Sequence, residues 1–343
     1  MVSVRDVAVL SGTSVGTVSN VLNHPERVSA KVRTKVQGAI DALGFVRNDA
    51  ARQLREGRSR MIGLVVLDAG NPFFTDVARG VERVADEAGL SVSLGNSDSR
   101  PERELRFLDL FEQQQVRGLL LSPSRRDEQF TERIERIRQR GVPVVLVDSP
   151  SDNSAVSSVA VDDALGGQLA VAHLLALGHH RIAFIGGPQE LTQVSDRLAG
   201  ARRALAEALS ADPASGIHLE VIPTSGLEVR AGRAAGEELL RRPAAERPRA
   251  IFAANDLVAI GLLQAFMLAQ PRVRVPEDIA LVGYDDIDFA KSAMVPLSSI
   301  HQPSELLGET AMRLLLRAEQ EGGLPAEQIV LKPELIARAS TLG

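Results

Sequence analysis

The first twenty-three residues constrain this chain most, because they are patterned as two short helices separated by a glycine. Ser3 and Ser14 stand where a side-chain oxygen can cap a helix, and Gly12 can form the tight turn between the helices. Apolar residues recur at three- and four-residue spacing in each segment: Val4, Val7, Ala8 and Leu10, then Val15, Val18, Val21 and Leu22. The pattern predicts a helix-turn-helix whose apolar residues pack inward.

The second helix leaves the short polar side chains Thr17, Ser19 and Asn20 on its outer and lateral faces. Such side chains can reach base edges in the major groove of DNA. A small helical hairpin without a nucleic-acid role is the alternative, and the charge argues against it. Residues 1–60 hold ten basic and five acidic side chains, a net +5, whereas the whole chain carries −5 and the remainder therefore −10. A basic end on an acidic chain favours DNA binding.

Two more segments complete this basic end. Ser29 is expected to cap a third helix that stops at Gly44. The apolar stripe of that helix is Val32, Val36, Ile40 and Leu43. Residues 48–55 then form one or two helical turns, which are marginal as an isolated helix, with a small apolar face at Ala50, Ala51 and Leu54.

The composition excludes several classes of protein. A length of 343 residues suits a small headpiece followed by a bilobed body. The absence of cysteine excludes disulfides and thiolate metal sites. No apolar run is long enough to span a membrane, and no secretory signal precedes the helix-turn-helix pattern, so a cytoplasmic location is expected.

From Met61 onward, short β-branched runs alternate with amphipathic helical segments, which predicts parallel sheets covered on both faces. The expected strands include 61–68, 116–123, 142–148, 181–187, 250–255 and 279–285. The expected helices include 72–88, 104–115, 163–177, 196–209, 227–240, 257–269 and 304–318. This number of units indicates two lobes rather than one sheet.

Polar residues stand at the ends of four expected strands: Asp68, Asp148, Asn255 and Asp285. Ligands of open α/β sheets bind beyond the carboxyl ends of the strands. Each of these residues alone could simply cap the helix that follows. Together, facing one cleft, they favour a polar small-molecule site.

The chain closely resembles the LacI/GalR family of bacterial transcription regulators. The resemblance covers essentially the whole length and rests on Arg5–Ala8, Thr17–Asn23, Asn48–Leu54 and motifs in the body. It implies an α/β fold class: an N-terminal all-α helix-turn-helix headpiece and a bilobed periplasmic-binding-protein-like body with two doubly wound parallel sheets. The implied domains are a headpiece (1–47), a hinge helix and linker (48–60) and an effector-binding and dimerisation body (61–343). Lobe 1 of the body is expected at about 61–161 and 300–321, and lobe 2 at about 162–290 and 325–343.

The resemblance also implies a DNA-binding surface. In the family, hinge helices of two subunits pair in the minor groove, and a leucine at the position of Leu54 wedges between base pairs. Linker packing is the alternative for Leu54, weakened by the nearby Arg52, Arg55, Arg58 and Arg60. The DNA-binding residues implied are Ser14, Val15, Gly16, Thr17, Ser19, Asn20, Asn23, Ala51 and Leu54.

The body resembles periplasmic sugar-binding proteins. Asn71-Pro72-Phe73-Phe74 is similar to an aromatic motif that covers a sugar ring in ribose-binding relatives, although either phenylalanine could instead belong to the core. The effector-binding residues implied are Phe73, Phe74, Asp148, Arg197, Asn255 and Asp285. Carboxylates, arginine and asparagine suit sugar hydroxyls, and phenyl faces suit the C–H side of a sugar. The expected effector is a small sugar, and the alternative is a purine or nucleobase corepressor.

Three positions depart from common family patterns. Ser149 stands where ribose-type relatives commonly have arginine, which puts a pentose in doubt. Val15 and Gly16 offer no side-chain hydrogen bonds at positions that choose operators. Asn20 replaces a frequent arginine, and asparagine prefers adenine to guanine.

Two other functions fit less well. An enzyme is disfavoured because Gly186-Gly187-Pro188 is not a dinucleotide or P-loop fingerprint and His179-His180 lacks metal-ligand spacing. A transport binding protein is disfavoured by the headpiece and the missing signal sequence. We therefore expect a non-enzymatic repressor with no cofactor and no bound metal. Its expected partners are double-stranded operator DNA and a small effector, with no membrane, and it is expected to act as a homodimer.

Overall fold

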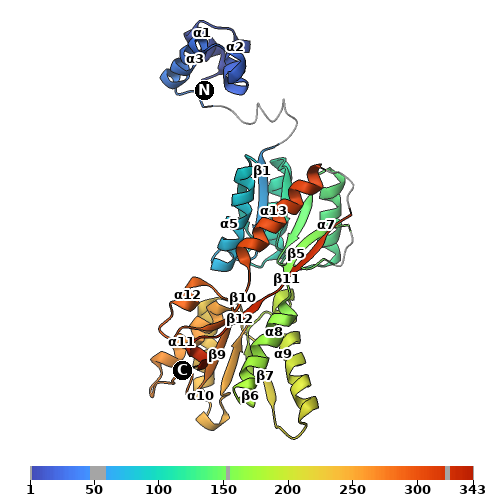
Figure 1. The fold of residues 1–343 in the computed structure, drawn as a ribbon, viewed down its shortest axis with the longest axis vertical. Helices are drawn as coiled ribbons and strands as arrows, with labels where there is room; N and C mark the ends of the chain where they lie inside the picture. The colour runs from blue at the N-terminus through green and yellow to red at the C-terminus, as the bar shows by residue number, and fades with distance from the viewer. Residues whose placement is uncertain (1, 47–58, 152–154, 321–324, 343) are drawn as a thin grey trace. The chain divides into compact units, whose positions relative to one another are not determined.

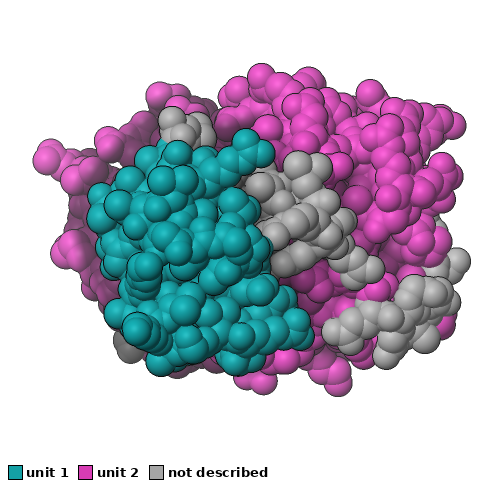
Figure 2. Space-filling model, turned by 90° about the horizontal axis from the view of Figure 1, so that it is seen from above, with its two compact units in different colours: residues 1–58 teal, residues 59–343 magenta. Residues whose placement is uncertain are grey.

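A computed structural model of the chain describes residues 2–46, 59–151, 155–320 and 325–342. The chain divides into two compact units, Met1–Arg58 and Ser59–Gly343, shown in teal and magenta in Figure 2. The predicted hinge helix, with Ala51 and Leu54, lies outside the described residues.

The headpiece contains three α-helices, α1 (Val4–Ser11), α2 (Val15–Asn23) and α3 (Ala30–Leu43), and the short 3-10 helix η1 (Pro25–Arg27). Ser3 caps α1 in a reciprocal capping box with Asp6, and Gly12 adopts the left-handed conformation with φ 57°. Ser14 caps α2 by accepting a hydrogen bond from the backbone N–H of Thr17 at 3.1 Å. The predicted two-helix pattern and both caps are therefore confirmed.

The headpiece core corrects three details. Val7, Val18 and Val36 are fully buried, as predicted. Leu10 is 54% exposed and Val15 47% exposed, because in this small unit each helix buries a narrower stripe than its apolar spacing suggests. Ser29 precedes α3 but makes no side-chain capping hydrogen bond.

The body is built on two six-stranded sheets. The first has the order β11-β5-β4-β3-β1-β2, with bounds Gln328–Leu331, Ser157–Val161, Val144–Val147, Gly118–Leu121, Met61–Val66 and Ser91–Asn96. The second has the order β12-β10-β9-β8-β6-β7, with bounds Glu334–Ile336, Ser298–His301, Ala280–Asp285, Ala250–Ala253, Arg181–Ile185 and His218–Ile222. All pairs are parallel except β10 with β12. This architecture confirms the predicted fold class.

Helices flank both sheets (Figure 1). We call the first sheet and its helices lobe 1: α5 (Pro72–Glu87), α6 (Pro101–Gln113), α7 (Glu128–Gln139) and α13 (Ser304–Gln320). We call the second sheet and its elements lobe 2: α8 (Asp163–Ala176), α9 (Thr192–Ala211), α10 (Val229–Arg241), η2 (Ala244–Glu246), α11 (Asp256–Leu268), α12 (Asp288–Lys291) and α14 (Ala339–Leu342).

The lobe bounds near the C-terminus differ from the prediction. Residues 300–301 end β10 in the second sheet, although they were placed in lobe 1. Residues 328–331 form β11, which pairs with β5 of the first sheet, although they were placed in lobe 2. The physical reason is that both sheets recruit a late strand at an edge, so the chain passes between the lobes after β5, after β10 and after β11.

Candidate DNA-binding and effector-binding sites

The outer face of α2 presents the predicted DNA-reading residues at the surface. Ser14, Val15, Gly16 and Asn20 are exposed, whereas Thr17, Ser19 and Asn23 are partly buried. Asn23 Nδ2 donates to the backbone oxygen of Ser19 at 2.8 Å, so this amide is engaged within its own helix.

The other two helices of the headpiece carry exposed basic side chains. Arg5 on α1 and Lys31, Arg33 and Lys35 on α3 are all exposed. Exposed cations in a small unit that also carries exposed polar side chains on one helix can neutralise phosphates while that helix reads bases.

The six residues predicted to bind the effector lie in the body. Phe73 and Phe74 begin α5, Asp148 follows β4, Arg197 lies in α9, Asn255 caps α11, and Asp285 ends β9. All six are at most 6% exposed. The first three lie in lobe 1 and the last three in lobe 2, and two hydrogen bonds join the lobes here. Asn71 Nδ2 donates to Asp285 Oδ2 at 3.0 Å, and Gln193 Nε2 donates to the backbone oxygen of Asp148 at 2.7 Å.

Arg197 is the centre of the lobe 2 side. Its Nε donates to Asp163 Oδ1 at 2.8 Å, and its Nη1 donates to the backbone oxygen of Ala254 at 2.8 Å. Its Cζ lies 3.7 Å from the ring centroid of Tyr284, and its Nη1 lies 3.8 Å from Asp285 Oδ1. Burial alone would lower the pKa of Arg197, but the surrounding carboxylates, Asp163 foremost, raise it, so the guanidinium stays charged.

The pKa values of two carboxyl groups of the site, Asp148 and Asp285, are raised, whereas the pKa of the ion-paired surface residue Asp278 is lowered. Burial raises the pKa of Asp148 well above its ordinary value, and the nearby Asp163 adds to the rise. Burial also raises the pKa of Asp285, although Arg197 opposes the shift. Both residues have left-handed backbones, with φ 55° and 103°, which is strained for a residue with a Cβ.

Two buried acceptor atoms in this region, Asp148 Oδ1 and Gln302 Oε1, have no hydrogen-bond partner among the described residues. Gln302 Nε2 meanwhile donates to Asp285 Oδ1 at 2.8 Å. Buried polar atoms are nearly always bonded, so these oxygens mark where hydroxyl or N–H donors of a ligand could bind.

Two of the four strand-end residues also serve the local backbone. Asp68 Oδ1 accepts from the N–H of Gly70 at 2.8 Å. Asn255 Oδ1 accepts from the N–H of Val258 at 2.9 Å and caps α11. Asn255 therefore acts as a helix cap through its side-chain oxygen, as the alternative interpretation expected. Only its side-chain N–H groups would be left to bind a ligand.

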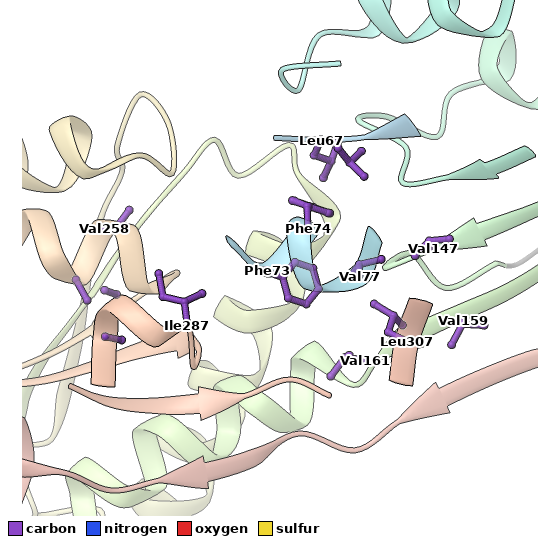
Figure 3. Packing of buried hydrophobic residues seen from close by; sticks show 14 of the residues in the cluster. Leu67, Phe73, Phe74, Val77, Val147, Val159, Val161, Val258, Ile287 and Leu307 are labelled. Carbon is purple, nitrogen blue, oxygen red and sulfur yellow. The ribbon is translucent and has the colours of Figure 1, made fainter. Parts of the chain in front are cut away.

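Phe73 and Phe74 both belong to one apolar cluster that includes residues of both sheets. Their rings meet edge to face with centroids 5.0 Å apart. In Figure 3, Phe74 points toward Leu67, whereas Phe73 points to the opposite side, between Ile287 and Leu307 in that view. The structure gives both rings a packing role, which supports the core alternative for each.

Five residues of this region were not predicted as site residues: Asn71, Asp163, Gln193, Tyr284 and Gln302. Asn71 stands in the Asn71–Phe74 motif, and Tyr284 directly precedes the predicted Asp285. Nothing in the local sequence separates Asp163, Gln193 and Gln302 from ordinary helix-start or loop residues, because their role depends on partners far along the chain.

The described residues contain no cluster of three or more His, Cys, Asp or Glu side chains placed to hold a metal ion. Among those same residues, no helix has the length and apolarity that a membrane span requires. A pocket of about 350 Å³ also lies beside α7, with Arg126, Phe130 and Leu146 in its wall and Thr192 of lobe 2 at its edge.

The chain is similar to known families and to known proteins. Residues 3–48 match the model for bacterial regulatory proteins of the lacI family, and residues 171–341 match a periplasmic binding protein-like domain. The ribose operon repressor of Escherichia coli K12 is 37% identical over 345 residues, covering 99% of this chain and 100% of that protein.

The chain belongs to the LacI family of bacterial regulatory proteins. The transcriptional repressor PurR of Aliivibrio fischeri is also 31% identical, covering 100% of this chain and 99% of that protein. The Lac repressor dimer bound to operator and an anti-inducer superimposes with a TM-score of 0.83 at 29% identity, covering 100% and 99% of the two chains. Membership confirms the prediction of a DNA-binding transcriptional regulator with an effector-binding body, and these relatives are regulators rather than enzymes.

Proposed function

We propose that this protein is an operator-binding repressor whose DNA affinity is controlled by a small, neutral, polyhydroxylated effector bound between the lobes. The buried group of Asp148, Arg197 and Asp285 carries the proposal, since it joins charged and hydrogen-bonding side chains of both lobes in one place. The effector acts as an inducer that releases DNA. The protein has no enzymatic activity and works in the cytoplasm, with a headpiece at 1–47, a hinge at 48–60 and a body beyond.

The charge of the site selects the class of effector. Three buried carboxylates, Asp148, Asp163 and Asp285, surround the single guanidinium of Arg197. The one guanidinium already has three acidic neighbours, so an anionic sugar would bring a buried charge without a cation to pair with it, whereas neutral hydroxyl donors suit the acceptor oxygens. A neutral purine base is the second candidate, supported by the 31% identity to PurR.

A thermal-shift screen tests the effector class. D-Ribose, neutral hexoses, a disaccharide, hypoxanthine and guanine are each added to the full chain, and a ligand of the folded state raises its melting temperature. Asp285→Asn should lose the shift given by the active compound, because the variant replaces an acceptor oxygen with a donor amide. Asp278→Asn, at a surface ion pair with Arg274, is the control and should keep the shift. A shift given only by purines would contradict the sugar.

Base reading by α2 is tested on an operator selected from random duplexes. Asn20→Ala should weaken binding to the selected operator by about 1–3 kcal/mol and binding to random DNA far less. Gln37→Ala, on the exposed face of α3, is the control. Equal losses on both DNAs would show that Asn20 reads no base. Binding of the unaltered protein should also weaken steeply as salt rises, because phosphate contacts release counterions.

We also propose that the protein acts as a homodimer, because a two-fold operator needs two headpieces side by side. The Lac repressor dimer on its operator supports this arrangement.

A further inference from the structure

Two hydrogen bonds that cross between the lobes have the same chemistry and opposite directions. Asn71 of lobe 1 donates through Nδ2 to Asp285 Oδ2 of lobe 2 at 3.0 Å. Gln193 of lobe 2 donates through Nε2 to Asp148 of lobe 1, at 2.7 Å to its backbone oxygen and 3.2 Å to Oδ2. In both cases an aspartate at a strand end accepts from a side-chain amide at the start of a helix in the opposite lobe. Asp285 accepts through its carboxylate, whereas Asp148 accepts through its backbone oxygen and, at the longer distance, its carboxylate.

These four side chains are at most 7% exposed, so both hydrogen bonds lie away from bulk water. A hydrogen bond to a buried carboxylate is stronger than one between exposed neutral groups, and losing its donor leaves the carboxylate short of partners. Beside these hydrogen bonds, two buried acceptor oxygens, Asp148 Oδ1 and Gln302 Oε1, have no hydrogen-bond partner among the described residues.

We propose that Asn71 and Gln193 are positioning residues that hold the two lobes closed and orient Asp285 and Asp148 toward the effector. The inference rests on the proposed effector site. Its consequence is that closure is partly built into the chain before any effector binds. An effector then needs only to fill the remaining acceptor positions, and its apparent affinity scales with the fraction of molecules already closed.

The test measures the distance between the lobes and needs neither effector nor DNA. The chain has no cysteine, so spin labels can be attached cleanly at Arg136→Cys on α7 and Arg203→Cys on α9, both exposed positions in different lobes. Labelled chain is diluted with an excess of unlabelled chain so that only distances within one subunit are recorded.

Gln193→Ala and Asn71→Ser should each lengthen and broaden the distance distribution, and the double variant should do so more. Serine keeps a helix cap at position 71, where Asn71 Oδ1 now accepts from the N–H of Phe73, so the loss is confined to the crossing bond. Gln168→Ala is the matched control, because Gln168 makes the same kind of bond to Glu207 at 3.0 Å within lobe 2. This control should leave the distribution unchanged.

A second variant separates this role from a general loss of packing. Gln193→Glu places a second carboxyl group against Asp148, near Asp163, Arg197 and Asp285. The lobes should open as the pH rises far enough to ionise both carboxyl groups, and they should close again as the pH falls and the two groups share a proton. The proposal is overturned if both single variants keep the distances of the unaltered chain, or if Gln193→Glu shows no change with pH. A failed effector screen would leave this result standing.

Discussion

Single residues of the buried group formed by Asp148, Arg197 and Asp285 couple its chemistry to the stability of the body. Asp148 has a pKa raised well above 3.8, chiefly by burial and also by Asp163. A carboxyl group whose pKa is raised on folding holds its proton more tightly in the folded state. The stabilisation contributed by Asp148 is therefore complete below pH 3.8, the pKa of the unfolded chain, and is lost as the pH rises through the higher pKa of the folded chain.

We predict that Asp148→Asn flattens the dependence of stability on pH. In the unaltered protein, the free energy of unfolding attributable to Asp148 falls as the pH rises above 3.8. Asparagine has nearly the same shape and no such proton, so the variant should lose less stability over that range. Urea unfolding at a series of pH values measures the difference.

Asp278→Asn is the opposing control for this experiment. Its ion pair with Arg274 lowers the pKa of Asp278 to about 2, so its stabilising effect is present above pH 3.8 and is lost as the pH falls through about 2. Asp278→Asn should therefore change how stability depends on pH only below pH 3.8. Identical slopes for Asp148→Asn and the unaltered protein above pH 3.8 would contradict the assignment.

Local pattern and position in the chain together anticipated where some residues lie in the fold. Asp148, Arg197 and Asp285 come together as expected from strand ends and motif resemblance. Gln193 and Asp163 could not be predicted, because their partners lie 45 and 34 residues away along the chain. Leu10 was misassigned because helical spacing gives a face but not how much of it a small three-helix unit can cover.

Pairs of helices in the body approach so closely that glycine is required at the crossing. In α5 and α13, a Cβ added at Gly308 would lie 2.0 Å from the backbone oxygen of Val77, and one at Gly80 would lie 2.1 Å from that of Glu305. Close approach of α8 to α9 similarly depends on Gly167 and Gly200. Neither contact can be relieved by moving a flexible side chain.

We predict that Gly308→Ala destabilises the body by about 1–3 kcal/mol, because α13 must move away from α5 to admit the methyl group. Gly38→Ala in α3 should instead stabilise the headpiece by about 0.5–1 kcal/mol, since no atom lies within 4 Å of the added Cβ and alanine favours helix. Hydrogen exchange of the two units reports each change separately. Full tolerance of alanine at Gly308 would show that the helix crossing is adaptable.

Strands were predictable where their residues form an unbroken apolar run. The interior strands β1, β3, β4, β6, β8 and β9 were expected, because residues covered on both faces form continuous apolar runs. The interior strands β5 and β10 were not expected although they are buried, because paired serines interrupt their apolar runs. The edge strands β2 and β7 were not among the expected strands, since their exposed and partly buried positions interrupt such runs. Helix α7 was also missed, and its charged surface explains why, as only Phe130, Ile134 and Ile137 are buried.

At the scale of the whole molecule, two large apolar side chains close in the sequence are exposed on lobe 2. Phe289 on α12 is 64% exposed, and Met294, five residues later, is 81% exposed. Large apolar side chains this close together at the surface mark a contact with another protein more often than a free surface. A second copy of the chain is the partner that the proposed two-fold operator demands.

We predict that Phe289→Glu with Met294→Glu converts the homodimer to a monomer. Buried charge without a partner would disfavour the interface, while each body should fold normally because both residues are exposed in the single chain. Sedimentation at micromolar concentration should change from about twice the 36.7 kDa chain mass to that mass itself. Operator affinity should fall with it, because two headpieces no longer bind together. Leu177→Glu, at another exposed apolar residue, should leave both measurements unchanged. A double variant that stays dimeric would place the interface elsewhere.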